Sequence, residues 1–301
     1  MTRKRIVSLL PGATEWVCKL GLADWLVGVS HECDYPGCVS DLPKVTRSRI
    51  NRQDSSADID RVVREHSDAR TPLFELDAEK IESLKPDLIL TQTLCNVCAV
   101  SEADVRQSLG RIGDGCELVD LRAMTFDQVI QDAELILQKT GASDQPLQRL
   151  RERIIAVRDR RAEADRSAEA KRSAETGSPP SVTLLEWTDP LFCAGHWTPQ
   201  LIDWAGGHDP IGRSGQPSRQ IEFQELLAAD PAMLLVACCG LPAQRGQKEW
   251  EQLVQDDRWS QLSCVQNQQV HVFDGSAWFN RPGPRLVDAL EAVAGLIHDT
   301  G

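Results

Sequence analysis

The chain has 301 residues, of which 41% are hydrophobic, and it carries a formal net charge of −12. This length is enough for one large domain or two ordinary ones with well-buried cores. The acidic balance argues against nucleic acid and anionic membranes as partners, because binding either of them needs a basic surface. No apolar stretch approaches the roughly 20 residues needed to cross a bilayer, so we expect no membrane insertion.

The first residues predict where the protein works. Only five apolar or small residues lie between Arg5 and Pro11, fewer than the roughly 7–15 of a secretory apolar region. We therefore expect a cytoplasmic protein without an export signal. Thiols stay reduced in the cytoplasm, so the ten cysteines favour buried small side chains and metal or redox sites over disulfides.

The first 142 residues alternate short apolar runs with helical patterns. The expected strands are 5–10, 25–30, 88–91 and 116–121, and the expected helices are 13–20, 59–66, 77–84, 102–109 and 125–139. Alternation of this kind predicts a parallel sheet covered by helices.

A long helical pattern follows, beginning near Ser143 or Pro146 and reaching about residue 175. If it is helical throughout, about 30 residues at roughly 1.5 Å each span about 45 Å, the length of a whole domain. Its second half is almost entirely polar, so a solvated linker is the alternative.

A second alternating block follows Pro180. Its expected strands are 182–186, 233–237 and 270–273, and its expected helices are 199–205, 223–229 and 285–298. The predicted architecture is α/β, with two Rossmann-like lobes: an N-terminal lobe over residues 1–142, a backbone helix over 143–176 and a C-terminal lobe over 177–301.

Four cysteines follow expected strands: Cys33, Cys95, Cys98 and Cys239. Loops at the carboxyl ends of parallel strands form the ligand crevice of open α/β sheets, so we expect these thiols at one rim. Thiolates are soft donors that select iron–sulfur clusters, zinc or copper(I). Cys238, adjacent to Cys239, is an alternative ligand.

Five short motifs occur along this layout: Ser8 to Glu15, Leu26 to Val29, Lys85 to Ile89, Ala205-Gly206-Gly207 and Arg281 to Leu286. Together with the layout, they resemble the class III substrate-binding proteins of ABC importers, which include cobalamin- and siderophore-binding proteins. The resemblance implies two lobes, a rigid backbone helix of the helical-backbone metal receptor type and a ligand held between the lobes. It spans nearly the whole chain.

Within that superfamily the chain looks closest to a branch labelled cobalamin-binding. The matching segments are Ser30 to Pro36, Thr46 to Arg49, Gln92 to Val100 and Ala194 to Trp197. This resemblance implies a corrinoid ligand. The fold does not fix the ligand, however, and the acceptor protein that would receive it is unknown.

Four cysteines are the ligand set of a 4Fe–4S cluster, whose iron corners are far enough apart to accept thiolates from separate loops. Zinc is the second metal that such a set holds. The pair Cys95 and Cys98 also fits a dithiol redox site of the thioredoxin kind, which would make the chain a thiol oxidoreductase. That alternative leaves Cys33 and Cys239 unexplained, and the pair lacks an intervening proline.

Further residues in the same loops complete the predicted site. His31 and His196 can ligate a metal, hydrogen-bond a cluster sulfide or cap corrin cobalt. Arg47 and Arg49 can hold an anionic cluster or a carboxylate. The aromatic side chains can stack on a flat macrocycle or shield a cluster; they are Tyr35, Trp187, Trp197 and Trp278.

No Walker loop, Ser-His-Asp order or His-Glu-x-x-His helix is present in the sequence, so we expect no enzyme. The leading hypothesis is a cytoplasmic, non-catalytic binding protein that holds an iron–sulfur cluster through the four cysteines. Cobalamin or another corrinoid in the same cleft is the second hypothesis, and the thiol oxidoreductase is the third.

Overall fold

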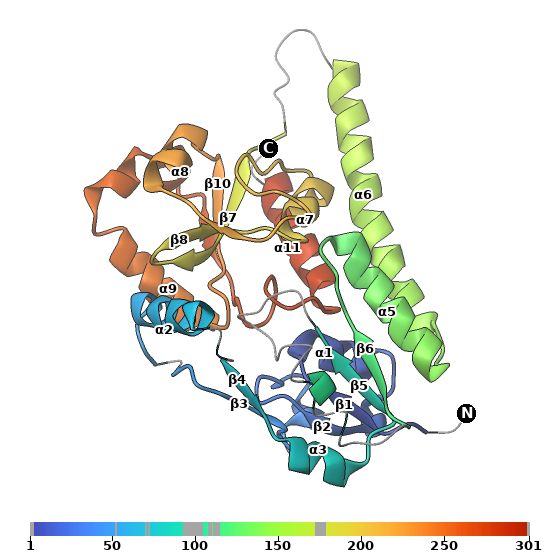
Figure 1. Ribbon diagram of the computed structural model, residues 1–301. Coiled ribbons are helices and arrows are strands. Elements are labelled where there is room, and N and C mark those ends of the chain that lie inside the picture. The colour runs from blue at the N-terminus through green and yellow to red at the C-terminus, as the bar shows by residue number, and fades with distance from the viewer. Residues whose placement is uncertain are drawn as a thin grey trace. The chain divides into compact units, whose positions relative to one another are not determined.

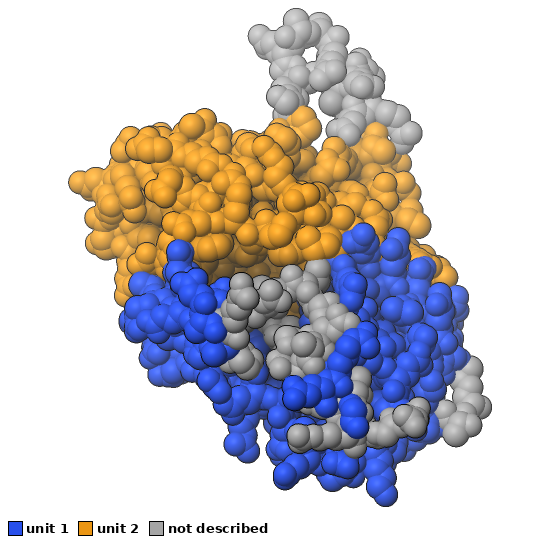
Figure 2. Space-filling view, in the orientation of Figure 1, with its two compact units in different colours: residues 1–123, 128–147, 282–284 blue, residues 124–127, 148–281, 285–301 orange. Residues whose placement is uncertain are grey.

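The computed structural model describes residues 3–51, 53–69, 71, 73–92, 105–107, 110, 115–171 and 179–299. Its contacts divide the chain into two compact units, coloured separately in Figure 2. Unit 1 comprises residues 1–123, 128–147 and 282–284, and unit 2 comprises 124–127, 148–281 and 285–301. Each unit has its own sheet flanked by helices, so the predicted α/β class is confirmed.

The described part of unit 1 is built on four parallel strands in the order β2-β1-β5-β6 (Figure 1). They are β1 (Ile6–Ser8), β2 (Leu26–Val29), β5 (Leu88–Thr91) and β6 (Glu117–Asp120). Every residue of β1 and β5 is buried, as expected for parallel strands covered on both faces. The four strands predicted for this region are all present.

Helices and one antiparallel strand pair complete the described part of unit 1. The helices are α1 (Pro11–Lys19), α2 (Ser56–Asp68), α3 (Ala78–Leu84) and α5 (Phe126–Thr140), and short 3₁₀ turns lie at Ala23–Trp25 and Gly37–Val39. The antiparallel strands β3 (Thr46–Ser48) and β4 (Phe74–Leu76) were not expected from the sequence. The apolar core joins sheet and helix side chains, among them Val7, Ile81 and Ile89. The helix predicted at 102–109 lies largely outside the described residues.

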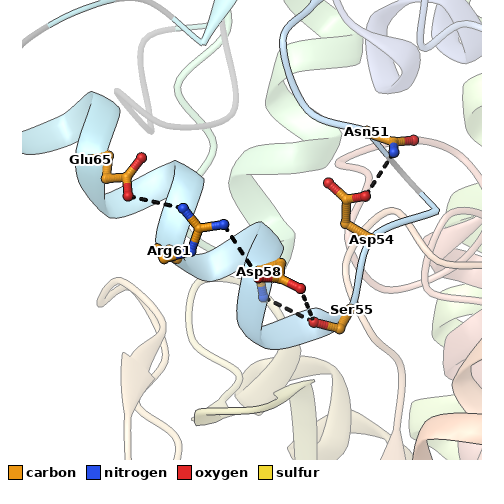
Figure 3. A network of polar contacts seen from close by, with 6 residues as sticks. All are labelled: Asn51, Asp54, Ser55, Asp58, Arg61 and Glu65. Carbon is orange, nitrogen blue, oxygen red and sulfur yellow. Dashed lines mark hydrogen bonds and ion pairs between the residues drawn. The ribbon is translucent and has the colours of Figure 1, made fainter.

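The first turn of α2 shows why the sequence-based boundary was late. Ser55 is the N-cap, and its Oγ accepts a hydrogen bond from the backbone N–H of Asp58 at 3.2 Å. The Ser55 hydroxyl also donates to the Asp58 carboxylate at 2.7 Å, and Arg61 bridges Asp58 and Glu65 one turn further along (Figure 3). The helix therefore begins at Ser56, three residues before the apolar pattern from which it was predicted.

The described part of unit 2 holds a five-stranded mixed sheet in the order β11-β10-β7-β8-β9. The strands are β7 (Val182–Thr188), β8 (Leu191–Cys193), β9 (Arg219–Gln220), β10 (Met233–Val236) and β11 (Val270–Val272). The predicted strands β7, β10 and β11 run parallel. The short strands β8 and β9, which were not predicted, add an antiparallel edge.

Around this sheet lie α7 (Thr198–Ala205), α8 (Phe223–Ala229), α9 (Ala243–Leu253), α10 (Ser263–Gln266) and α11 (Leu286–Asp299), with a 3₁₀ turn at Asp257–Gln261. The core of the unit is centred on the fully buried Trp259. Its ring meets Phe223 and Trp250 edge-on, with centroids 5.1 and 5.2 Å apart. Aromatic pairs in this geometry gain more than their buried area alone provides.

The long pattern forms α6 (Gln145–Lys171), a continuous helix of 27 residues. Within unit 2, Arg153 binds Asp288 and Glu291 on α11, each at 2.6 Å. Arg158 lies over the Trp204 ring of α7, 4.6 Å from its centroid. Charged side chains thus fasten the helix to two neighbours of the same unit, which is why a polar sequence is helical here. Over the described residues, none of the helices combines the length and the apolar character that a membrane span requires.

Candidate ligand-binding site

In unit 1 the loop after β2 is held by a network centred on Thr46 of β3. The Thr46 hydroxyl donates to Ser30 Oγ at 3.0 Å and accepts from the backbone N–H of His31 at 3.0 Å. Its Oγ1 also lies 2.7 Å from His31 Nδ1. The other nitrogen, Nε2, is buried 3.4 Å from Glu32 Oε1, so His31 serves here as a loop anchor.

Cys33 is likewise held by neighbours in its own unit. Its side chain is 1% exposed, and its Sγ lies 3.0 Å from the Thr14 hydroxyl on α1. Thr14 in turn donates to Ser8 Oγ at the end of β1, at 2.8 Å. The Lys44 ammonium donates to the carbonyl oxygen of Cys33 at 2.7 Å. Cys33 thus belongs to a polar network that joins two strand ends to α1.

The remaining predicted residues of unit 1 are at the surface. Arg49 donates from Nε and Nη2 to Glu75 Oε1, at 3.0 and 2.7 Å, so the neighbouring strand already neutralises its charge. Arg47 is exposed, and Tyr35 is 48% exposed. Of the predicted polar and aromatic groups in this unit, Arg47 and Tyr35 offer the most accessible surface to a ligand.

The predicted metal centre finds no support in the structure. Cys95 and Cys98 lie outside the described residues. Among the residues that are described, no group of three or more His, Cys, Asp or Glu side chains is placed to hold a metal ion. The expectation of a 4Fe–4S cluster, and that of zinc, therefore rests on the sequence pattern alone.

In unit 2, two strand-end loops are pressed together. A Cβ at Gly275, in the loop after β11, would overlap the carbonyl oxygen of Cys238 after β10. Asn280 donates from Nδ2 to the carbonyl oxygens of Ala237 at 2.9 Å and Gly275 at 3.0 Å. Burial raises the pKa of the Cys238 thiol to about 12, whereas Cys239 is exposed. Cys239 is thus the more accessible of the two candidate thiols.

His196 lies in the tight loop between β8 and α7. Its φ of 50° is held by two backbone hydrogen bonds with the 215–216 turn, at 2.6 and 3.0 Å. Its Nδ1 is 3.4 Å from the Ser218 hydroxyl, and its ring lies 5.5 Å from that of Trp197. Burial lowers the pKa of His196, so the imidazole is neutral near neutral pH and keeps a nitrogen lone pair.

The three predicted tryptophans of unit 2 occupy different environments. Trp197 is 7% exposed and donates from Nε1 to the carbonyl oxygen of Phe279 at 2.7 Å. It is therefore a core side chain rather than one with surface available to a ligand. Trp187 and Trp278 are half-buried, and the Trp278 ring lies 5.3 Å from Phe273. Trp187 and Trp278 therefore retain aromatic surface for a ligand.

Several residues that organise these loops were not predicted. Thr46, Lys44 and Thr14 fix the loop after β2, and Asn280 ties the ends of β10 and β11 together. The sequence carries little sign of them, because each acts on a partner in another loop. A separate surface depression of about 300 Å³ in unit 2 is lined by Pro199, Gln200, Asp203, His208, Asp209 and Ser214.

Comparison with known proteins gives consistent results. A family profile described as "Periplasmic binding protein" matches residues 159–277. The vitamin B12-binding protein of Vibrio cholerae serotype O1 is 24% identical over 290 residues, covering 96% of this chain and 87% of the relative. That of Photorhabdus laumondii is 23% identical, covering 99% of this chain and 89% of the relative.

Two solved structures show the same fold. The periplasmic vitamin B12 binding protein BtuF of Vibrio cholerae has a TM-score of 0.69 at 22% identity, covering 98% of this chain and 97% of that one. A periplasmic haem-binding protein from Pseudomonas aeruginosa has a TM-score of 0.70 at 20% identity, covering 99% and 94%. The relatives are named for ligand binding, and their fold, with two α/β units, is the one that this chain has. Residues 159–277 match the periplasmic binding protein profile, and the whole chain shares the fold of these solved substrate-binding proteins, as the sequence motifs implied.

The expected cytoplasmic location is wrong. The matching profile is described as periplasmic, and the solved relatives from Vibrio cholerae and Pseudomonas aeruginosa are named as periplasmic proteins. These relatives point to the periplasm. The expectation of thiols kept reduced, which depended on a cytoplasmic location, loses its basis as well.

Proposed function

We propose that this protein binds a corrinoid of the cobalamin class and delivers it to the membrane permease of an ABC transporter. The observation that carries the proposal is similarity along the whole chain to proteins named for vitamin B12 binding, which cover 96% of its length. A match of this extent includes both units. It supports the corrinoid that was the second hypothesis from the sequence, in place of an iron–sulfur cluster.

The chemistry of the strand-end loops supports a macrocyclic ligand. A corrin has broad apolar faces, which bind aromatic side chains, and polar groups around its rim. Trp187 and Trp278 in unit 2 and Tyr35 in unit 1 are aromatic residues with exposed surface. The neutral imidazole of His196 supplies a nitrogen donor for the cobalt or a hydrogen-bond partner for the rim.

Haem is the second candidate, since several solved structures with this fold are named for haem binding. It shares a flat, metal-centred ring with the corrinoids but carries two propionate groups. The exposed guanidinium of Arg47 is the kind of group that binds a carboxylate. The two candidates therefore differ in whether Arg47 contributes to affinity.

Parallel titrations of the purified full-length protein with cobalamin and with haemin test the proposal. Calorimetry and the visible spectrum should show saturable binding of cobalamin, and haemin should bind more weakly. Trp278→Ala should lower cobalamin affinity about 10-fold or more, as loss of a buried aromatic contact does. Trp250→Ala is the matched control, because Trp250 is also half-buried in unit 2 but packs on Trp259.

Three results would contradict the proposal. Tighter binding of haemin, weakened by Arg47→Ala, would identify a haem-binding protein. Binding of neither macrocycle, with stoichiometric iron and sulfide in protein purified without air, would restore the cluster. Equal losses of affinity in Trp278→Ala and Trp250→Ala would show that the tryptophan effect is structural.

A further inference from the structure

The loop that carries His196 packs against a second loop of unit 2, residues 209–218. The backbone N–H of His196 donates to the carbonyl oxygen of Gln216 at 2.6 Å, and its own carbonyl oxygen accepts from the N–H of Gly215 at 3.0 Å. A Cβ at Gly195 would overlap the carbonyl oxygen of Gln216, so a glycine is needed beside His196. The position of the His196 backbone therefore depends on the conformation of the 209–218 loop.

Asp209 fixes the start of that loop. It is 7% exposed, and its Oδ1 accepts from the backbone N–H groups of Ile211 at 3.0 Å and Gly212 at 2.9 Å. The same oxygen accepts from the hydroxyl of Thr183 on β7 at 3.3 Å. A Cβ at Gly212 would come within 2.8 Å of the carbonyl oxygen of Ala194. One carboxylate oxygen thus ties the 209–218 loop to the central strand of the sheet, where it packs against the loop after β8.

Ser218, at the end of the same loop, holds the imidazole ring. Its Oγ accepts from the backbone N–H of Gly195 at 3.1 Å and lies 3.4 Å from Nδ1 of His196. Among the described residues, no hydrogen bond or ion pair engages the other ring nitrogen, Nε2, and Nε2 is not one of the buried atoms that lack a partner. Histidines that bind a metal usually hold one ring nitrogen on a fixed partner, which orients the other. The ring of His196 is thus held at Nδ1, and Nε2 is left for a ligand.

The other predicted histidine, His31, is arranged differently. Its Nδ1 lies 2.7 Å from Thr46 Oγ1, and its Nε2 is buried 3.4 Å from Glu32 Oε1. Groups of its own unit therefore surround both nitrogens of His31. His196 also has a φ of 50°, and a residue other than glycine keeps such a φ only where its surroundings impose it, as happens often at ligand sites. Of the two candidate histidines, His196 is the one with a nitrogen to offer.

We propose that Asp209 and Ser218 are positioning residues for His196, which contacts the ligand through Nε2. Asp209 fixes the loop, the loop fixes the backbone of His196, and Ser218 fixes its ring. This inference rests on the proposed function, since the ligand is the macrocycle proposed above. It adds that Asp209 and Ser218 determine the affinity for that ligand by acting through His196.

A double-mutant cycle on the full-length protein tests the proposal, with cobalamin affinity measured by calorimetry. His196→Ala should weaken binding about 10-fold, and Asp209→Ala should weaken it about 5-fold. Because both changes act through one imidazole, Asp209→Ala should cause no further loss in a protein that already carries His196→Ala. Asp209→Asn keeps an oxygen that accepts from Ile211 and Gly212, so it should bind within about twofold of the wild type.

Asp230→Ala is the matched control. Asp230 also accepts from a backbone N–H in unit 2, that of Ser263 at 2.8 Å, but it supports the start of α10. Its loss should leave cobalamin affinity unchanged. Ser218 is half-buried, so its variants should fold even if Asp209→Ala does not. Ser218→Ala should weaken binding about threefold, and Ser218→Thr, which keeps the hydroxyl, should restore it.

The outcomes separate this inference from the proposed function. Wild-type affinity in His196→Ala or in Ser218→Ala would overturn the inference alone, and so would an equal loss from Asp209→Ala with and without His196. If haemin binds in place of cobalamin, the same cycle with haemin gives the same decision. If the wild type binds neither macrocycle, the proposed function fails and the inference fails with it.

Discussion

The two units present loops at the carboxyl ends of parallel strands, yet they fix those loops by opposite means. In unit 1, short polar side chains do so: Thr14 links Ser8 to Cys33, and Thr46 links Ser30 to His31. In unit 2, backbone segments lie almost in contact, as where Gly275 abuts Cys238, and tryptophan and asparagine side chains bond to carbonyl oxygens.

The difference predicts opposite sensitivities. A polar network loses stability when one member is removed, because the other buried groups are left without partners. Where two backbone segments pack closely, a larger side chain between them destabilises the protein, because there is no room for the added atoms. Substitutions that remove a polar side-chain group should therefore destabilise the loops of unit 1. Substitutions that add side-chain atoms should destabilise the loops of unit 2.

The largest effect is expected from Gly275→Ala. The added methyl group would overlap Cys238 O, and the free energy of unfolding should fall by about 3 kcal/mol or more. Urea denaturation measures the loss. Gly295→Ala is the control, since its Cβ would meet open space on α11 and alanine favours a helix by about 1 kcal/mol over glycine. Equal stabilities of the two variants would refute the close-approach argument.

Next in size is Thr46→Val in unit 1. Valine keeps the shape but removes the hydroxyl that bonds Ser30 and His31, and we expect a loss of about 2–3 kcal/mol. Thr71→Val removes a hydroxyl that bonds His66 at the surface and should change stability by no more than about 0.5 kcal/mol. If both variants unfold at the same urea concentration, the buried network does not stabilise the unit.

A smaller effect is expected from Trp197→Phe. The ring is nearly preserved, but Phe279 O loses its hydrogen bond, at a cost of about 1–2 kcal/mol in the free energy of unfolding. Cobalamin affinity should remain at the wild-type value, in contrast to Trp278→Ala. A loss of affinity without a loss of stability would return Trp197 to the ligand wall predicted from the sequence.

A further effect is a pH dependence in unit 1. Burial raises the pKa of Asp132 on α5 to about 7, although the backbone N–H groups of Ala123 and Arg122 lower it. Because the folded state holds this proton more tightly than the unfolded state, the stability it contributes is present below about pH 4 and lost as the pH rises through about 7. As the pH rises from about 5 to about 8, the Tm of the wild type should fall relative to the Tm of Asp132→Asn. A constant difference in Tm over that range would contradict the raised pKa.

The sequence predicts the interior of this protein better than its loops. Strand β5 and helix α8 were predicted with the boundaries that the structure gives, because a buried apolar run and a helical apolar pattern both repeat regularly. The antiparallel pair β3 and β4 and the short strands β8 and β9 are two or three residues long, too short to show a period.

The candidate site was harder to predict than the fold. Cysteine spacing suggested a metal centre, but spacing does not reveal that the Cys33 thiol lies against the Thr14 hydroxyl of α1. The predicted aromatic residues differ in setting: Trp187 lies on strand β7 and not in a loop, Trp197 is buried and Trp278 is half-buried. The burial of Trp197 depends on a contact with Phe279, about 80 positions away, which spacing does not show.

One feature of the chain path bears on how the protein is made. Unit 1 is completed by residues 282–284, which the ribosome adds near the end of synthesis. A Cβ at Gly12 would come within 2.7 Å of the carbonyl oxygen of Pro282, and one at Gly283 within 3.3 Å of Glu15. The start of α1 therefore lacks the segment that it packs against until residues 282–284 have been added. A fragment ending at residue 147 would lack this partner permanently, so we expect that unit 1 cannot complete its folding from the first 147 residues alone.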